Sequence, residues 1–325
     1  MLQSITEGPG ISHTPTDSLE EIEHFAVQLA WRAGKILSNK FGFDLAIEYK
    51  DDRKFDPVTR IDRECQELIR CCVAERFPSH GFIGEEDRPD EQRASPDFLW
   101  VVDPLDGTKN YVNGLPIFAC SIGVLYQGAP VVAATYIPWP ACSGLVMHAR
   151  KGNGTFVGEN PAAVFKGARP EHFKLSTLPG SFRTAFSVAE KMSNTTGEAR
   201  NTGSMAYDLA LTANGVLQYT VMTSPRIWDV AAGALLVTEA GGTVLIGRHA
   251  SRLRYLLLGR LKWTPLEKFI PRWESGHTRI SEVWSWSHNL VAGGPGTAGF
   301  VSSSLRRKSP LTRRVARFFE RGKKG

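Results

Sequence analysis

The stretch at residues 100–110 constrains this chain more than any other part of its 325 residues. An apolar run there predicts a buried strand, and the run ends abruptly at two carboxylates, Asp103 and Asp106. Burying two like charges this close together costs free energy unless a cation neutralises them. Gly107 and Thr108 follow in a tight turn and offer backbone N–H groups to an anion. The pattern therefore indicates a cation that bridges the protein and a phosphate.

Carboxylates also stand at the boundaries of apolar segments elsewhere in the chain. Four groups result: Asp56 with Asp62, Glu85 with Glu86, Asp103 with Asp106, and Asp229 alone. Each group by itself has an ordinary explanation as a helix cap or a solvated loop. Together they supply oxygen ligands from four separate places, which is how a site for a hard cation such as Mg²⁺ is built.

The composition, with 42% hydrophobic and 22% charged residues, is typical of a soluble globular protein. No apolar run approaches the roughly 20 residues that span a bilayer. Residues 1–16 are polar, so we expect a disordered N-terminus and not a secretory signal. The five cysteines are odd in number and lack the spacing of a metal site, which favours reduced thiols in a cytoplasmic protein.

The net charge of +6 comes from the end of the chain. Residues 305–325 carry nine Lys or Arg and one Glu, which leaves residues 1–304 with a net charge of about −2. Apolar residues recur there with helical spacing among arginines, so this basic tail predicts an amphipathic helix from about Thr312. Contact with an anionic membrane, contact with nucleic acid and a solvated tail remain open alternatives.

Periodicity and caps predict the regular elements. Helices are expected at residues 17–39, 57–77, 205–213 and 228–239, the second of them capped by Asp56. Strands are expected near residues 45–49, 82–83, 98–102, 117–126, 130–137, 144–149, 216–222, 244–246 and 289–292. Residues 247–287 are basic, hold four tryptophans and show no clear period, so we expect an insertion or a large loop there.

Four motifs resemble those of the inositol monophosphatase family of metal-dependent phosphatases. They are Asp-Pro-Val-Thr-Arg-Ile-Asp at 56–62, Gly-Glu-Glu at 84–86, Asp-Pro-Leu-Asp-Gly-Thr-Lys-Asn at 103–110 and Trp-Asp-Val-Ala-Ala-Gly at 228–233. They occur in the family order, and the resemblance covers roughly residues 18–246 together with a strand and a helix near residues 288–305.

The resemblance implies an α/β (α+β) fold, a layered αβαβα sandwich of the inositol monophosphatase and fructose-1,6-bisphosphatase type. A catalytic domain would span residues 17–304, with lobes at about 17–150 and 151–304, the insertion at 247–287, and the basic tail at 305–325. Family members are commonly homodimers, which makes a homodimer one possibility for this chain, although nothing in the sequence itself indicates it.

The resemblance also implies two to three Mg²⁺ ions and a role for each acidic residue. Glu85, Asp103 and the backbone carbonyl of Leu105 would hold the first ion, and Asp103, Asp106 and Asp229 the second. A third, weaker ion would use Glu85 and water, and its displacement would make the enzyme lithium-sensitive.

The resemblance further implies that Thr108 would orient and deprotonate the attacking water. Asp62 would lie behind Thr108, and Glu85 would lie nearby. The backbone N–H groups of Gly107 and Thr108 would bind the phosphate.

The implied substrate is a small phosphorylated metabolite, most simply inositol monophosphate, with Gly203, Ser204, Met205 and position 222 on the substrate side. Inositol phosphatases typically carry Glu seven residues before the Trp-Asp aspartate, where this chain has Met222. A thioether is a weak hydrogen-bond acceptor, so histidinol phosphate and adenosine 3′,5′-bisphosphate remain alternatives. A regulatory binding protein that acts through the basic tail is the alternative of another class.

Overall fold

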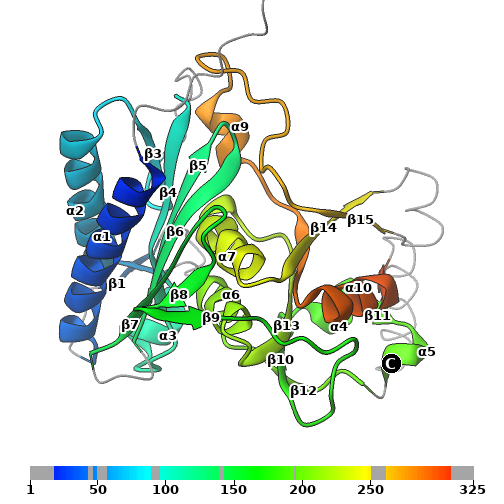
Figure 1. The fold of residues 1–325 in the computed structure, drawn as a ribbon. Coiled ribbons are helices and arrows are strands. Elements are labelled where there is room, and N and C mark those ends of the chain that lie inside the picture. The colour runs from blue at the N-terminus through cyan, green and yellow to red at the C-terminus, as the bar shows by residue number, and fades with distance from the viewer. Residues whose placement is uncertain are drawn as a thin grey trace, which may run out of the picture.

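The computed structural model describes residues 18–42, 47–49, 57–88, 96–138, 143–193, 195–249 and 261–308. Asp56 and the expected amphipathic helix from Thr312 lie outside these residues. Within the described parts, two sheets alternate with three layers of helices (Figure 1). The expected αβαβα sandwich is therefore confirmed.

The larger sheet lies in the N-terminal half of the chain. Its strands run in the order β3 (Gly81–Gly84), β4 (Phe98–Asp106), β5 (Ala119–Tyr126), β6 (Ala129–Ile137), β7 (Leu145–Arg150), β8 (Thr155–Val157) and β9 (Asn160–Ala162). Only the β3–β4 pair is parallel among the neighbours in this order. Both β3 and β4 therefore end at the same edge of the sheet, which brings the segments that follow them together.

The smaller sheet has the order β12 (Glu198–Arg200), β10 (Leu175–Thr177), β13 (Leu217–Met222), β16 (Asn289–Gly293), β14 (Thr243–His249) and β15 (Leu261–Pro265). Two short pairs complete the strands: β1 (Ile47–Tyr49) with β2 (Pro57–Thr59), and β11 (Phe186–Val188) with β17 (Leu305–Arg307). Because β17 pairs with β11, the folded part of the chain extends into the segment that the sequence marked as the basic tail.

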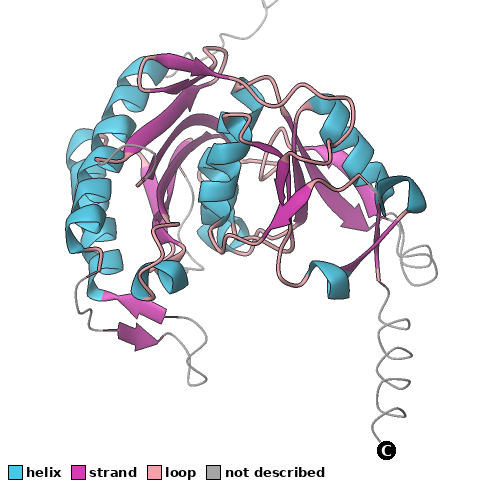
Figure 2. Cartoon of the chain, turned by 90° about the horizontal axis from the view of Figure 1, so that it is seen from below, coloured by secondary structure: helices cyan, strands magenta, loops and turns pink. Residues whose placement is uncertain are grey.

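Helices form the other three layers (Figures 1 and 2). The outer layer on the larger sheet holds α1 (Leu19–Lys40) and α2 (Arg60–Arg76), and the middle layer holds α6 (Met205–Ala213) and α7 (Ile227–Glu239). The far layer holds α4 (Phe182–Ala185), α5 (Glu190–Ser193) and α10 (Pro295–Ser304), while α3 (Thr108–Val112) and α9 (Ile280–Trp284) are single short turns. Among the described residues, no helix is both long enough and apolar enough to cross a membrane.

The three apolar clusters of the core fill the spaces between these layers. The middle layer is apolar all round because it is sandwiched: α7 buries ten of its thirteen residues. The outer helix α1 is amphipathic and begins at the cap of Ser18, whose side chain accepts a hydrogen bond from the Glu20 N–H at 3.2 Å. Leu266, Phe269 and Val283 are buried in the cluster around α7. The described part of residues 247–287 is thus a packed part of the domain with regular elements, which its sequence pattern did not indicate.

The helix expected from residue 57 begins later, at Arg60. Thr59 is its cap: the Thr59 side chain accepts from the Ile61 N–H at 3.2 Å, and the Thr59 N–H donates to Oδ2 of Asp62 at 2.9 Å. This reciprocal pattern is a capping box, with Asp62 in the place usually taken by Glu or Gln. The prediction that Asp56 caps this helix is therefore wrong, because residues 57–59 are strand β2.

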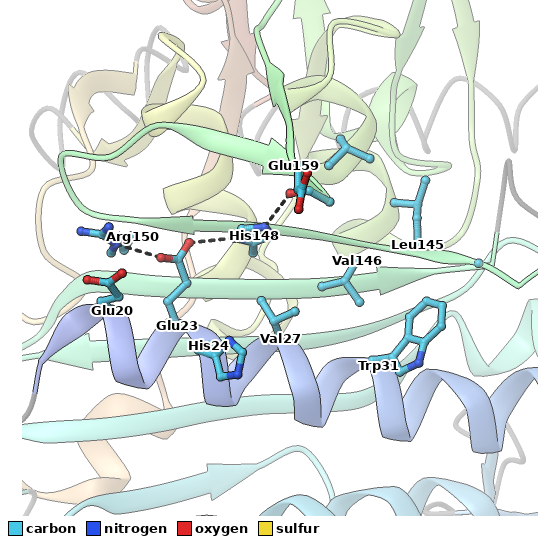
Figure 3. A pocket seen from close by; sticks show the side chains of 13 residues that line it. Glu20, Glu23, His24, Val27, Trp31, Leu145, Val146, His148, Arg150 and Glu159 are labelled. Carbon is cyan, nitrogen blue, oxygen red and sulfur yellow. Dashed lines mark hydrogen bonds and ion pairs between the residues drawn. The ribbon is translucent and has the colours of Figure 1, made fainter.

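A buried carboxylate, Glu23, ties α1 to β7 of the larger sheet (Figure 3). It accepts hydrogen bonds from Nε of Arg150 at 2.9 Å and faces Nδ1 of His148 at 2.7 Å. The other ring nitrogen of His148 lies 2.9 Å from the carbonyl oxygen of Gly158. Both neighbours of the ring are acceptors, so the doubly protonated imidazolium satisfies both. The hydrogen bond to Glu23 raises the pKa of His148, and partial burial opposes that shift.

This contact predicts a pH-dependent stability. The pKa of His148 is raised on folding. Its contribution to the free energy of unfolding is therefore fully present below the unfolded pKa of about 6.5, and it is lost as pH rises through the folded pKa. We expect His148→Gln to lower the free energy of unfolding by about 1 kcal/mol at acidic pH and by less at alkaline pH. Urea titrations of both proteins across this range measure the difference, and an equal cost at all pH values would contradict it.

Candidate active site

Two acidic side chains lie at the carboxyl end of β4. Asp103 is opposite Ser121 of β5 and Asp106 is opposite Ala119, with an irregularity of register between them. Strand β4 therefore continues four residues beyond the predicted run, to Asp106. The Leu105 N–H donates to Oδ1 of Asp103 at 3.0 Å, so the irregular turn itself orients this carboxylate.

Glu85 reaches the same edge because it directly follows β3. Its backbone N–H donates to the carbonyl oxygen of Val102 at 3.0 Å, which extends the parallel pairing by one residue. The motif predicted at residues 84–86 therefore lies beside the motif at residues 103–110, as the parallel pairing requires.

The turn after Asp106 depends on glycine. Gly107 has φ +91°, and a Cβ there would lie 2.8 Å from the carbonyl oxygen of Ile117 and 3.1 Å from Cβ of Ser204. Thr108 then begins α3. Its hydroxyl oxygen is 3.0 Å from the carbonyl oxygen of Leu105 and 3.4 Å from Oδ1 of Asp62, so its single proton is donated to one of these acceptors at a time.

Asp62 lies behind Thr108 and is only 2% exposed. Burial raises its pKa to about 6, against the opposing effect of the hydrogen bonds from Thr59. This carboxylate can therefore take up a proton near neutral pH while it is held in place by the N-terminus of α2.

The helices of the middle layer hold Asp106 and Asp229. The Ser204 hydroxyl donates to Oδ2 of Asp106 at 2.8 Å, and the Ala206 N–H donates to the same oxygen. Burial raises the pKa of Asp106 to about 6, and these hydrogen bonds oppose the rise. Asp229 is the third residue of α7, and its Oδ2 accepts from the Arg226 N–H at 2.7 Å.

The charges of these carboxylates interact. Asp103 is 1% exposed, and burial raises its pKa well above the ordinary value, with further increases from the charges of Glu85, Asp106 and Asp229. The pKa of Asp229 is likewise raised, first by burial and then by Asp106 and Glu85. Within the described parts of the chain, no Lys or Arg forms an ion pair with Asp103, Asp106 or Asp229. The charges of four carboxylates from three segments thus act on one another, and the nearby Arg226 opposes the rise in the pKa of Asp229 only as a smaller effect.

This donor set fits a hard divalent cation in its chemistry. All its donors are oxygens, and a bound cation would relieve the mutual repulsion that raises these pKa values. As the side chains lie, no three acidic, histidine or cysteine residues in the described chain form a group that could hold a metal ion. Three of the carboxylates also accept hydrogen bonds from the local donors given above.

The predicted substrate-side residues differ in how exposed they are. Gly203 is exposed, with φ +84°, at the turn before α6, and Met205 is partly buried at the start of this helix. Ser204 is buried and its hydroxyl is committed to Asp106. Met222 is 2% exposed and packs in the apolar cluster around α7, so its side chain is not offered to a ligand here.

Sequence reasoning missed two features next to the site. Nδ2 of Asn110 donates at 2.7 Å to the carbonyl oxygens of both Ile117 and Thr202, which fastens the β4 turn to the turn before α6. Trp284 of α9 packs on Trp228 with ring centroids 4.6 Å apart, directly before Asp229. Asn110 was visible as part of a motif, whereas nothing in the pattern of residues 247–287 indicated the tryptophan contact.

A large pocket lies elsewhere in the described chain. It has a volume of about 720 Å³ and lies between α1 and β7, where Trp31, Leu145 and His148 line it (Figure 3). None of the predicted site residues contributes to it. The chemistry of the acidic cluster therefore decides the assignment of the active site, and pocket size does not.

Comparison with known proteins agrees with the motifs. The model of the inositol monophosphatase family matches residues 18–264. Inositol monophosphatase 2 of Solanum lycopersicum is 35% identical over 244 residues, which cover 70% of this chain and 88% of that protein. Nus factor SuhB of Escherichia coli is 31% identical over 248 residues, covering 73% and 89%. The crystal structure of the extragenic suppressor protein suhB from Bartonella henselae superimposes with a TM-score of 0.64 at 26% identity, covering 87% of this chain and 97% of that one. This chain belongs to the inositol monophosphatase family.

Proposed function

We propose that this protein is a metal-dependent phosphomonoesterase that hydrolyses a small phosphorylated metabolite. The observation that carries the proposal is the meeting of Glu85, Asp103, Asp106 and Asp229, where burial and the neighbouring carboxylates raise the pKa of Asp103 and of Asp229. Family membership supports phosphatase activity and, in general, dependence on metal ions.

Glu85, Asp103, the carbonyl of Leu105, Asp106 and Asp229 would hold two to three Mg²⁺ ions. Bound metal of this kind activates water as a nucleophile and stabilises charge on the phosphoryl oxygens. The protein's part is to keep these ligands at one edge of the larger sheet. It does so through the parallel β3–β4 pair and through the contacts of Asp106 with Ser204 and Ala206.

Thr108 and Asp62 would position the attacking water and accept its proton, with Glu85 nearby. The Thr108 hydroxyl faces Asp62, and the raised pKa of that buried carboxylate suits a proton acceptor near neutral pH. The backbone N–H groups of Gly107 and Thr108 would bind the phosphate. Gly107 has a left-handed backbone conformation, which is typical of turns that bind anions through successive N–H groups.

The Thr108 hydroxyl gives a direct prediction. Thr108→Ala removes the group that links the water to Asp62, so we expect kcat to fall by about 10²-fold or more while KM changes little. Thr108→Ser keeps the hydroxyl and is expected to retain most of the activity. Steady-state kinetics of both variants decide the point, and equal losses in the two would show that Thr108 acts through its methyl group and not through its hydroxyl.

Inositol monophosphate is the substrate that we propose first, because of the family and the inositol monophosphatases among the relatives. Met222 supplies no polar group, so histidinol phosphate and adenosine 3′,5′-bisphosphate are the alternatives. Phosphate release should be measured for these three and for fructose 1,6-bisphosphate. A clear preference for inositol 1-phosphate supports the first choice, and preference for another ester replaces it.

A second candidate function is a regulatory contact made through the basic tail. Its basis is the charge of residues 305–325 and the relative that is named a Nus factor. The partner would be nucleic acid or an anionic membrane. Salt-dependent binding to RNA or to anionic vesicles should be compared between the full chain and a chain that ends at residue 308, which keeps β17. Equal binding by both chains would count against the tail. A homodimer is also proposed and is testable by light scattering.

A further inference from the structure

A second pocket lies where the two sheets meet, and the proposed catalysis does not use it. We call it the seam pocket. Its volume is about 540 Å³, within the size range of sites for small molecules. It is lined by Ala129, Lys151, Ile246, Arg248, Thr264, Pro265, Glu267, Lys268 and Pro271. These residues come from the turns that begin β6 and follow β7, from β14 and β15, and from the segment after β15. None of the proposed catalytic or metal-holding residues is among them.

Backbone hydrogen bonds fix the walls of this seam pocket. The Phe269 N–H donates to the carbonyl oxygen of Gly128 at 2.7 Å, which joins the segment after β15 to the β5–β6 turn of the other sheet. The Leu266 N–H donates to the carbonyl oxygen of Val244 at 2.9 Å. Phe269 is 1% exposed and Leu266 is 8% exposed, so the residues between them are anchored at both ends. The pocket is therefore a formed feature of the fold and not a gap beside a free loop.

The charged side chains that line the pocket are mostly positive. Lys151, Arg248 and Lys268 line it, against the single carboxylate of Glu267. In the part of the chain that the structure describes, none of these three cations forms an ion pair. Arg248 also stands directly opposite Lys262 in the β14–β15 ladder, and like charges in this position repel. Three exposed cations from separate segments thus line one pocket with a single carboxylate among them, and an anion stabilises such an arrangement.

We propose that the seam pocket binds a small metabolite that carries more than one phosphate group, at a site separate from the catalytic one. Arg binds phosphate oxygens with two parallel hydrogen bonds and Lys binds them as a point charge, so the three cations can serve two phosphate groups. The pocket is larger than one phosphate requires, and Ile246, Pro265 and Pro271 offer an apolar wall for the rest of the molecule.

The test uses the full chain with Asp103→Asn and a chelator present, so that the probe is neither hydrolysed nor held through metal at the catalytic site. Binding of ATP and of pyrophosphate is measured by calorimetry. We expect Arg248→Gln with Lys268→Gln to weaken ATP binding about tenfold or more. The matched control, Arg32→Gln with Lys40→Gln on α1, removes the same charge elsewhere and should leave binding within about twofold. Glu267→Gln removes the opposing carboxylate and should tighten binding.

Three results would overturn the proposal. One is the absence of ATP and pyrophosphate binding by a folded protein. Another is an equal loss in the pocket variant and the α1 control, which would mean unspecific attraction to net charge. The third is a single-stranded RNA that binds more tightly than ATP and loses affinity in the pocket variant, which would assign the cations to nucleic acid. Phosphatase activity of the pocket variant without Asp103→Asn should stay unchanged, so failure here is distinguishable from failure of the proposed function.

Discussion

Asp103→Asn is expected to reduce phosphate release by about a thousandfold or more. Asp103 is proposed to be shared between two metal ions, so its loss would weaken both and remove the charge stabilisation that they supply. The substitution keeps an oxygen that accepts from the Leu105 N–H, so the turn should survive. Initial rates with saturating Mg²⁺ measure the effect.

Stability separates this effect from unfolding. In a chelator, Asp103→Asn should be as stable as the wild type or more stable, because it removes a carboxylate whose charged form is disfavoured by burial and by the charges of Glu85, Asp106 and Asp229. The matched control is Asp97→Asn, just before β4 at its opposite end, which should keep near-normal rates. Retention of wild-type activity by Asp103→Asn, or an equal loss in Asp97→Asn, would refute the assignment.

Gly107→Ala is expected to have the second-largest effect. Its Cβ would lie 2.8 Å from the carbonyl oxygen of Ile117 and 3.1 Å from Ser204, in a left-handed conformation that disfavours any side chain. We expect the free energy of unfolding to fall by about 1–3 kcal/mol, and phosphate release to fall about a hundredfold as the turn with Asp106 and Thr108 shifts.

Gly241→Ala provides the matched control for backbone strain alone. Gly241 has φ +82°, and a Cβ there would meet nothing within 4 Å. This variant should lose about 1 kcal/mol of stability and keep its activity. If the two variants lost activity equally, the close packing of Gly107 against Ile117 and Ser204 would not be the cause. Urea titrations and initial rates of both proteins provide the comparison.

Local patterns predicted much of the fold. The helix expected at residues 228–239 is α7 at Ile227–Glu239, because its apolar run and the glycines that follow it are strong signals. The acidic residues could be singled out because they stand at the boundaries of apolar segments. The predicted start of α2 was wrong, although the sequence held the signal for the correct one. Thr59 and Asp62 form the capping box, whereas Asp56 was the more obvious candidate for the cap.

Contacts across long sequence separations could not be predicted from local pattern. Ser204 binds Asp106 across 98 residues, and Asn110 reaches Thr202 across 92 residues. Neither pairing leaves a periodic signal, because each depends on how the middle helices dock on the larger sheet. The segment that holds β15 and α9 was missed for a related reason. Trp284 packs on Trp228 of α7 and Trp286 packs on Phe269, and these contacts leave no helix or strand period in the sequence.

The central claim is tested most directly by phosphate release before and after metal removal. Purified full-length protein should hydrolyse at least one phosphate monoester in Mg²⁺, lose that activity in a chelator, and regain it when Mg²⁺ is restored. Phosphate release that continues unchanged in the chelator would contradict the account, because the carboxylates at the end of β4 would then have no role that requires a cation.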